Sequence, residues 1–190
     1  MESNKIGVIY YKHPIYNDYA YEPITDEIYS LKNNQIRLMK QEITSYNNYL
    51  RISVYKDKKA KNYYVHRFVW ECYYNEILDK NIDIDHKDRQ RINNHISNLR
   101  KVTRATNNLN KYTNVEVHEL PEDNIEVIKY NKHYFEDLYF SPLTDCLYKI
   151  SDGYIFKIPF KTRKRVQIYD KNKKLTSIYL NKLIKIIKNH

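Results

Sequence analysis

An internal repeat is the feature that most constrains how this 190-residue chain can fold. Tyr21-Glu-Pro-Ile-Thr-Asp-Glu-Ile-Tyr29 aligns with Phe140-Ser-Pro-Leu-Thr-Asp-Cys-Leu-Tyr148, and Pro, Thr, Asp and Tyr match at a constant offset of 119. Two further pairs of segments follow in the same order: Ile52–Tyr55 with Val166–Tyr169, and Tyr64–Val69 with Tyr179–Ile184. Conserved order predicts two divergent copies of one small unit, with chance similarity in a biased composition as the alternative.

Each copy predicts short strands followed by a helix. Pro-x-Thr-Asp favours a turn, and Asn33-Asn34 and Asp152-Gly153 are typical of hairpin turns. The alternating segments that predict strands are 28–31, 35–39, 49–55 and 63–66 in the first copy, and 147–150, 154–158, 165–169 and 175–180 in the second. Helical spacing follows at 67–74 and 181–188. An α+β fold is therefore expected, with two copies of an antiparallel sheet plus helix flanking a central segment.

The central segment, Ile82–Thr103, combines a strand with a polar loop. Residues 82–85 predict a strand and residues 87–96 a loop. Ser97 is a good N-cap, so we expect a helix from Asn98. We predict four domains from these patterns. They are an N-terminal β-rich repeat (1–76), a central core that carries the polar loop (77–111), an acidic linker (112–135) and a basic C-terminal repeat (136–190).

The net charge of +10 indicates a polyanionic partner. Residues 86–111 hold seven basic residues and one acidic residue, and residues 157–190 hold eleven and one. Such blocks suit contacts with the nucleic-acid backbone. The candidates for phosphate contacts are Arg89, Arg91, Arg100, Lys101, Arg104, Lys161, Arg163, Lys164, Arg165, Lys173 and Lys174.

Composition excludes other classes of protein. An apolar run of about 18 residues is absent, so no membrane span is expected. Two cysteines are too few for a disulfide framework or a cysteine-based zinc ribbon. We expect an intracellular protein.

Four polar residues of the central segment can support phosphodiester hydrolysis. The strand end and helix start are expected to bring together Asp85, His86, Asn94 and Asn98. Histidine can take a proton from water near neutral pH, and carboxylate and amide oxygens suit Mg²⁺ or Mn²⁺. On the residues alone, an ordinary surface turn is the simpler interpretation.

An ordered set of motifs raises the weight of the catalytic interpretation. Val65-His-Arg-Phe-Val69, Ile84-Asp-His-Lys-Asp88, Asn93-Asn-His-Ile-Ser-Asn-Leu-Arg100 and Asn107-Asn108 together resemble the HNH endonuclease family. The likeness is to its phage- and intron-encoded homing branch, and covers about residues 60–111.

The resemblance implies a ββα-metal finger around one divalent cation, Mg²⁺ or Mn²⁺. It implies His86 as general base, Asn94 as the residue that holds the loop and orients His86 through the backbone, and Asp85 and Asn98 as metal ligands. Arg89 stands where the family often has glycine. The cleaved DNA would carry 5′-phosphate and 3′-hydroxyl ends.

The implied function is a metal-dependent endonuclease acting on double-stranded DNA, as a monomer in preference to a dimer. A retired nuclease that only binds DNA and an HNH restriction enzyme remain alternatives, with a membrane-surface protein more distant. His66 is expected to hydrogen-bond beside the site, His95 to be exposed, and Trp70 and Cys72 to lie in the core.

Overall fold

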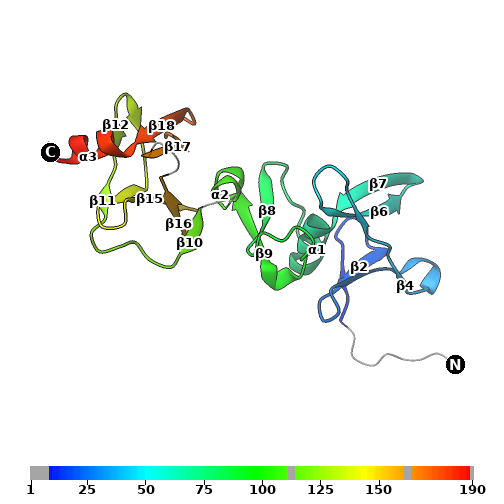
Figure 1. The fold of residues 1–190 in the computed structure, drawn as a ribbon. Helices are drawn as coiled ribbons and strands as arrows, with labels where there is room; N and C mark the ends of the chain where they lie inside the picture. The colour runs from blue at the N-terminus through cyan, green and yellow to red at the C-terminus, as the bar shows by residue number, and fades with distance from the viewer. Residues whose placement is uncertain (1–8, 111–113, 161–163, 189–190) are drawn as a thin grey trace. The chain divides into compact units, whose positions relative to one another are not determined.

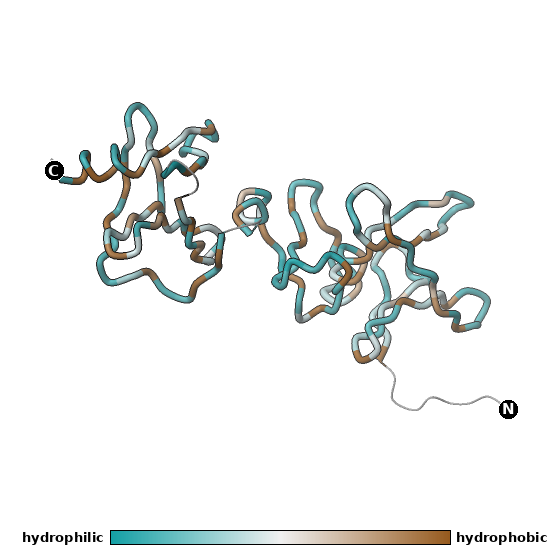
Figure 2. Tube along the Cα trace, in the orientation of Figure 1, coloured by the Kyte–Doolittle hydropathy of each residue, from teal (hydrophilic) through white to brown (hydrophobic). Residues whose placement is uncertain are grey.

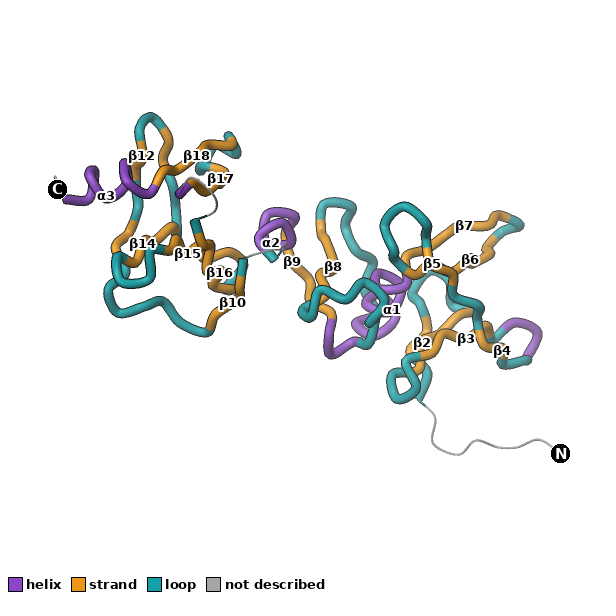
Figure 3. The backbone as a smooth tube through the Cα atoms, viewed as in Figure 1, coloured by secondary structure: helices purple, strands orange, loops and turns teal. Residues whose placement is uncertain are grey.

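The computed structural model describes residues 9–110, 114–160 and 164–188. The chain divides into two compact units, Met1–Arg104 and Ala105–His190, each described below by itself. Short strands dominate both units, with few and short helices among the described residues (Figures 1 and 3).

The first unit combines two small sheets, a helix and a separate hairpin. Its strands are β1 (Tyr11–Lys12), β2 (Tyr19–Glu22), β3 (Glu27–Ser30), β4 (Arg37–Leu38), β5 (Glu42–Ile43), β6 (Leu50–Lys56), β7 (Lys59–Tyr64), β8 (Ile82–His86) and β9 (Leu99–Thr103). Helix α1 spans Val65–Tyr74, and 3-10 turns occupy Lys32–Asn34 and Ile96–Asn98. The sheets run β1-β2-β3-β4 and β5-β6-β7, and β8 pairs with β9 alone.

The β2–β3 turn has the geometry that the Pro-x-Thr-Asp sequence predicts. Asp26 adopts a left-handed conformation (φ 58°) and accepts a hydrogen bond from the Tyr21 hydroxyl at 2.9 Å. The Glu22 carboxylate accepts hydrogen bonds from the backbone N–H groups of Ile24 and Thr25, both at 2.8 Å. Side-chain acceptors of this kind favour a turn over a continued strand.

Helix α1 follows β7 directly and packs its apolar stripe into the core. Val65, Phe68, Val69 and Cys72 recur at helical spacing and are all buried. Asn75 ends the helix in the left-handed conformation (φ 51°). Cys72 and the neighbouring Trp70 are buried, as predicted.

The β8–β9 hairpin shares this core. Ile84 and Leu99 are buried with Tyr21 and Ile28 of the first sheet and Phe68 of α1 in one hydrophobic cluster. The structure therefore divides the chain differently from the four predicted domains, because residues 77–104 of the predicted core fold as one unit with the N-terminal strands up to residue 76.

The second unit contains a five-stranded sheet and two hairpins. Its strands are β10 (Val115–Val117), β11 (Ile125–Glu126), β12 (Lys129–Tyr130), β13 (His133–Tyr134), β14 (Leu138–Ser141), β15 (Cys146–Ser151), β16 (Tyr154–Pro159), β17 (Arg165–Tyr169) and β18 (Leu175–Tyr179). The sheet order is β10-β16-β15-β14-β11, and β12–β13 and β17–β18 pair separately. Helix α2 spans Arg104–Leu109 and α3 spans Leu180–Lys188.

The segment predicted as an acidic linker, 112–135, belongs to this unit in its described part. Strand β10 pairs with β16, and β11 pairs with β14. Val127 and Tyr130 join a core that includes Phe140, Phe156 and Ile178. Its acidic residues lie on β10, on β11 and in the loop between them, and Glu116, Glu119 and Glu126 are exposed, which gave this segment a linker-like composition.

The predicted strands and terminal helices are largely confirmed, whereas the helix predicted from Asn98 is wrong. Leu99–Thr103 is strand β9, paired antiparallel with β8, and the helix α2 begins only at Arg104. Leu99 and Val102 point to opposite faces of β9 and are both buried, so the burial of these two residues did not require a helix.

Hydrophobic and hydrophilic residues are mixed along the described trace (Figure 2). Every helix in the part of the chain that the structure describes is too short or too polar to cross a lipid bilayer.

Candidate active site

The β8–β9 hairpin brings the predicted site residues together. Asp85 and His86 are the last two residues of β8, and they face Arg100 and Leu99 of β9 in the antiparallel register. Asp85 and His86 are both buried, at 7% and 4% exposure. A buried carboxylate and imidazole at the end of a strand are uncommon without a structural or chemical role.

The loop that joins β8 to β9 is held by the side chain of Asn98. Its Oδ1 accepts a hydrogen bond from the Asp88 backbone N–H at 3.1 Å. Its Nδ2 donates to Asp88 Oδ1 at 2.9 Å and to the Asn93 carbonyl at 2.8 Å. Arg89 adopts φ 65°, a conformation that glycine adopts most easily, which explains why glycine suits this position in the family.

Asn94 orients His86 directly. Asn94 Nδ2 donates to the Ile92 carbonyl at 3.1 Å, so its Oδ1 faces His86 Nε2 at 3.1 Å. His86 Nε2 must therefore carry a proton, and in the neutral ring Nδ1 is the basic nitrogen. The predicted orientation of His86 by Asn94 thus has a side-chain basis in the structure, rather than the backbone route that was expected.

The environment keeps His86 neutral at physiological pH. Burial lowers the pKa of His86, the hydrogen bond to Asn94 and the charges of Asp85 and Asp88 oppose this, and the positive charge of Arg91 adds to it. A neutral imidazole is the form that can accept a proton from water.

Aromatic rings surround His86. The rings of Tyr49 and His66 lie 5.8 Å and 5.2 Å from it, centroid to centroid. His66 Nδ1 is buried without a hydrogen-bond partner in the described residues, and burial, followed by the charges of His86 and Arg67, lowers the pKa of His66 to about 3. His66 lies beside the site, as expected, but contacts it through its ring instead of through a hydrogen bond.

Asp85 forms a buried ion pair with Arg100. Arg100 Nε donates to Asp85 Oδ2 at 2.9 Å, and the two side chains are 4% and 8% exposed. Arg100, predicted to contact DNA phosphates, therefore lies inside the unit in this structure and balances the charge of Asp85.

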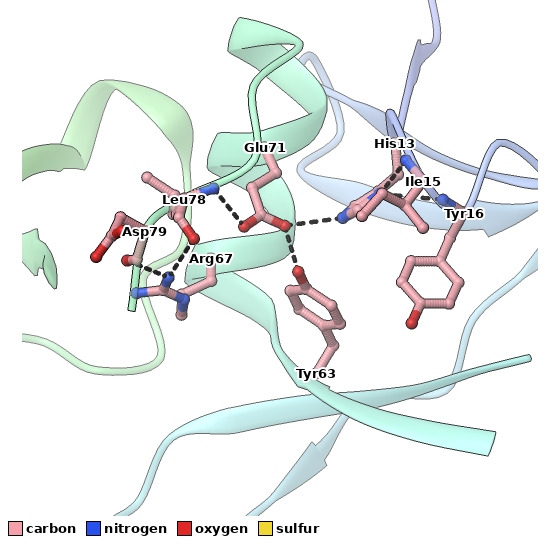
Figure 4. Close-up of polar contacts among 8 residues, drawn as sticks. All are labelled: His13, Ile15, Tyr16, Tyr63, Arg67, Glu71, Leu78 and Asp79. Atoms are coloured by element: carbon pink, nitrogen blue, oxygen red, sulfur yellow. Dashed lines mark hydrogen bonds and ion pairs between the residues drawn. The ribbon is translucent and has the colours of Figure 1, made fainter. Parts of the chain in front are cut away.

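A second polar cluster lies around Glu71 and Arg67 of α1 (Figure 4). Glu71 of α1 accepts hydrogen bonds from His13 Nε2 at 2.9 Å, from the Leu78 backbone N–H at 3.0 Å and from the Tyr63 hydroxyl. Arg67, one turn earlier, donates to the Ile82 carbonyl at 2.7 Å. The cluster thus links the N-terminal segment, α1 and the chain that enters β8.

His95 ties the loop to the first sheet. Its Nε2 lies 3.1 Å from the Pro23 carbonyl and its Nδ1 lies 2.7 Å from the Ser97 hydroxyl. The Tyr21 hydroxyl accepts a hydrogen bond from the Ile96 N–H at 3.4 Å. The prediction that His95 is exposed was wrong, because the β2–β3 turn covers it in part.

The remaining predicted DNA contacts fall into three groups. Lys101 pairs with Glu76 at 2.8 Å and Arg104 pairs with Asp83 at 3.3 Å. The second group consists of the exposed side chains of Arg89, Arg91, Lys164, Arg165, Lys173 and Lys174. Lys161 and Arg163 lie outside the described residues.

The donor set fits a divalent cation in part. Asp85 offers a buried, hard carboxylate oxygen beside the candidate base, as such a cation requires. Asn98 fits poorly, because both ends of its amide are used within the loop. The assignment of Asn98 as a metal ligand stays a prediction that this geometry does not favour.

Sequence reasoning missed Tyr49, His13 and Glu71. Each acts through contacts with residues distant in the sequence, such as the contact between His13 and Glu71. Glu71 is the one residue that the sequence could have pointed to, because it stands between Trp70 and Cys72 in a segment predicted to be a buried helix. A glutamate in such a place is rarely buried without a partner.

Sequence comparisons relate the segment that carries the site to known proteins. The HNH endonuclease family matches residues 63–109, from β7 through α2. DNA endonuclease I-HmuI of Bacillus phage SP01 is 36% identical over 83 residues, which are 44% of this chain and 45% of that protein. This chain therefore matches less than half the length of the curated relative.

A solved structure entitled "DNA binding and cleavage by the HNH homing endonuclease I-HmuI" is 32% identical, with a TM-score of 0.46 and coverage of 54% of this chain and 56% of that chain. By the family match and the sequence likeness to I-HmuI, the segment of residues 63–109 resembles the HNH endonuclease family.

Proposed function

We propose that the protein is a divalent-metal-dependent endonuclease that hydrolyses phosphodiester bonds of double-stranded DNA at a specific site. The proposal rests on the hydrogen bond from His86 Nε2 to Asn94, which leaves Nδ1 as the basic nitrogen of the neutral ring. The buried carboxylate of Asp85 precedes His86 in the chain. General bases of this kind must be neutral, buried in part and fixed in orientation.

In the proposed reaction, His86 Nδ1 removes a proton from a water molecule whose oxygen forms the new bond to phosphorus. The bond from phosphorus to the 3′ oxygen breaks, and that oxygen takes a proton from solvent, giving 5′-phosphate and 3′-hydroxyl ends. Asn94 keeps the ring oriented throughout, because its own amide is anchored on the Ile92 carbonyl.

Asp85 would hold the cation, which when bound offsets negative charge on the phosphate and the leaving oxygen. Mg²⁺ or Mn²⁺ suits an oxygen ligand of this kind. Because Asn98 is engaged in the loop, another oxygen ligand is expected from elsewhere in the segment that matches the family.

DNA binding is proposed to rest on exposed basic residues of both units, namely Arg89 in the first and Lys164, Arg165, Lys173 and Lys174 in the second. Such contacts predict affinity that falls steeply with salt. Two unequal units in one chain favour a long asymmetric site read by a monomer, and DNA as substrate implies an intracellular location.

The test is nicking or cutting of a supercoiled plasmid that carries the DNA flanking the gene. Wild-type protein should cleave with Mg²⁺ or Mn²⁺ and stop when EDTA is added. His86→Ala should lower the cleavage rate at least about 10³-fold and leave DNA affinity unchanged. Wild-type protein that binds this DNA but never cleaves it would contradict the proposal and favour a retired nuclease that only binds DNA.

The DNA sequence that the protein cleaves also distinguishes a homing enzyme from a restriction enzyme. Cleavage within a long, degenerate, asymmetric sequence indicates the first, which we propose. Cleavage at a short palindrome by a dimer would indicate the second.

A further inference from the structure

Arg91 differs from Arg51, Arg100 and Arg104 in how its charge is balanced. Arg100 and Arg104 pair with Asp85 and Asp83, and Arg51 pairs with Glu42. Within the residues that the structure describes, Arg91 has no carboxylate partner, and its side chain is exposed. A guanidinium in this state keeps its full charge available to an anion that arrives from solvent.

The protein nevertheless fixes where the Arg91 guanidinium lies. Its Nη1 donates to the Asn47 carbonyl at 2.8 Å, and its Cζ lies over the Tyr49 ring, 5.1 Å from the ring centroid. A cation–π contact and one neutral hydrogen bond orient the group without neutralising it. A guanidinium has more N–H donors than one such hydrogen bond uses, so an anion can still be bound.

Tyr49 links this group to the base. Its ring is half buried, lies 5.8 Å from the His86 ring and packs against His66 at 4.9 Å. Asn47 and Tyr49 lie in the loop between β5 and β6. Arg91 contacts the Tyr49 ring, and the Tyr49 ring in turn lies against the His86 ring.

We propose that Arg91 is a catalytic residue that contacts the phosphate being cleaved, and that Tyr49 is the positioning residue that holds it there. The inference rests on the proposed function and adds the group that stabilises the charge developing on the phosphate. Donors fixed before the reaction are effective in this role because they need no rearrangement as the charge grows.

The test uses single-turnover cleavage of the plasmid carrying the gene's flanking DNA, with affinity measured separately in Ca²⁺. Arg91→Ala should lower the cleavage rate about 100-fold while the Kd changes less than about threefold. Arg91→Lys should recover about tenfold of that loss, because lysine restores the charge but not the planar guanidinium.

Chemical rescue separates contact with the phosphate from a structural role. Guanidinium chloride at millimolar concentration should raise the Arg91→Ala rate relative to sodium chloride at equal ionic strength. Arg37→Ala, which removes an exposed arginine on β4, is the matched control and should show neither loss nor rescue. An Arg91→Ala rate equal to that of wild type, or a loss explained wholly by weaker binding, overturns the inference.

A double-mutant cycle tests Tyr49. Tyr49→Leu should lower the rate strongly in the wild-type background and much less in the Arg91→Ala background. Equal losses in both backgrounds would show that Tyr49 does not act through Arg91. If wild-type protein fails to cleave at all, the proposed function fails first and this inference falls with it; cleavage by wild type with an unaffected Arg91→Ala removes this inference alone.

Discussion

The two units share a local pattern but bury very different groups. Each has a hairpin closed by a left-handed aspartate, Asp26 or Asp145, and a later hairpin that leads into a helix. In the first unit the described residues bury nine polar side chains, and in the second four. The contrast teaches that the first is built to position chemistry, whereas the second carries its distinctive residues, a block of positive charge, on its surface.

The two hairpin turns show how the same shape is reached with different residues. In the first unit Glu22, within the hairpin, accepts the Ile24 N–H at 2.8 Å. In the second, Asp123 from outside the hairpin accepts the Leu143 N–H at 2.7 Å and a bond from Ser141. A turn needs an acceptor at a given place, and the chain can supply it from different positions. Two divergent copies of one unit remain a proposal that these turns suit.

The helices differ in the same way. Helix α1 buries His66 and Glu71 together with its apolar face. Helix α3 buries Leu180 and Leu183 and carries Lys185 and Lys188 in its last turn. Four sets of substitutions test the comparison, from the largest expected effect to the smallest.

Glu71→Ala should destabilise the first unit by about 3 to 5 kcal/mol, because His13 and the Leu78 N–H lose a buried charged acceptor. Unfolding of this unit can be followed by fluorescence, since Trp70 in α1 is the one tryptophan of the chain. Glu119→Ala, which removes an exposed glutamate of the second unit, is the control. Equal effects of the two substitutions would remove the distinction between the units.

His66→Asn, which copies Asn181 of the second unit, should flatten the pH dependence of Trp70-detected stability. The pKa of His66 is lowered to about 3 in the folded unit. Below its ordinary pKa of about 6.5 the unfolded chain therefore gains a proton that the folded unit does not, and stability falls. Wild type should lose about 2 kcal/mol from this group between pH 8 and pH 5, continuing toward pH 3.

The same measurement on His66→Asn should show no such decrease from this position. A wild-type stability that stays constant from pH 8 to pH 5, or an identical slope in the variant, would mean that His66 is not held neutral by the fold.

Asn98→Asp distinguishes a loop residue from a metal ligand. An aspartate cannot donate to Asp88 Oδ1 or the Asn93 carbonyl, and it sets two carboxylates against each other. We expect cleavage to fall about tenfold to a hundredfold, in line with the removal of one or two hydrogen bonds to charged or buried groups. Tighter Mn²⁺ binding with retained cleavage would instead identify Asn98 as a ligand.

Lys173→Ala combined with Lys174→Ala tests the charge of the second unit. For each phosphate contact that the double variant loses, the plot of log affinity against log salt should become less steep by about 0.9. Affinity at low salt should fall about tenfold. The cleavage rate at saturating protein should not change. The matched control removes two exposed lysines from the 112–135 segment, Lys129 and Lys132, and an equal effect there would argue against a localised anchor.

Much of the local structure could be predicted from the sequence. The strand predicted over 165–169 is β17, and the helices predicted over 67–74 and 181–188 begin within two residues of α1 and α3. These segments have clear periodicity and good turn residues at their ends. The prediction for the region from Asn98 to Thr103 was wrong because pairing with β8 outweighed the helical signals of Ser97 and Leu99.

By itself, the sequence determined the composition of the site, the excess of positive charge and the match of residues 63–109 to a nuclease family. Motif order along a chain is enough for this, because the chemistry needs those residue types at those spacings. It placed Asp85, His86 and Asn94 in one site.

Only the tertiary structure decided which groups act on which. Contacts between separate elements decide three features of the site. They are the ion pair of Arg100 with Asp85, the tautomer of His86 and the cation–π contact of Arg91 with Tyr49. The physical reason is that burial and hydrogen-bond partners set charge, protonation and orientation, and these depend on where the chain returns in space rather than on which residues are neighbours along it.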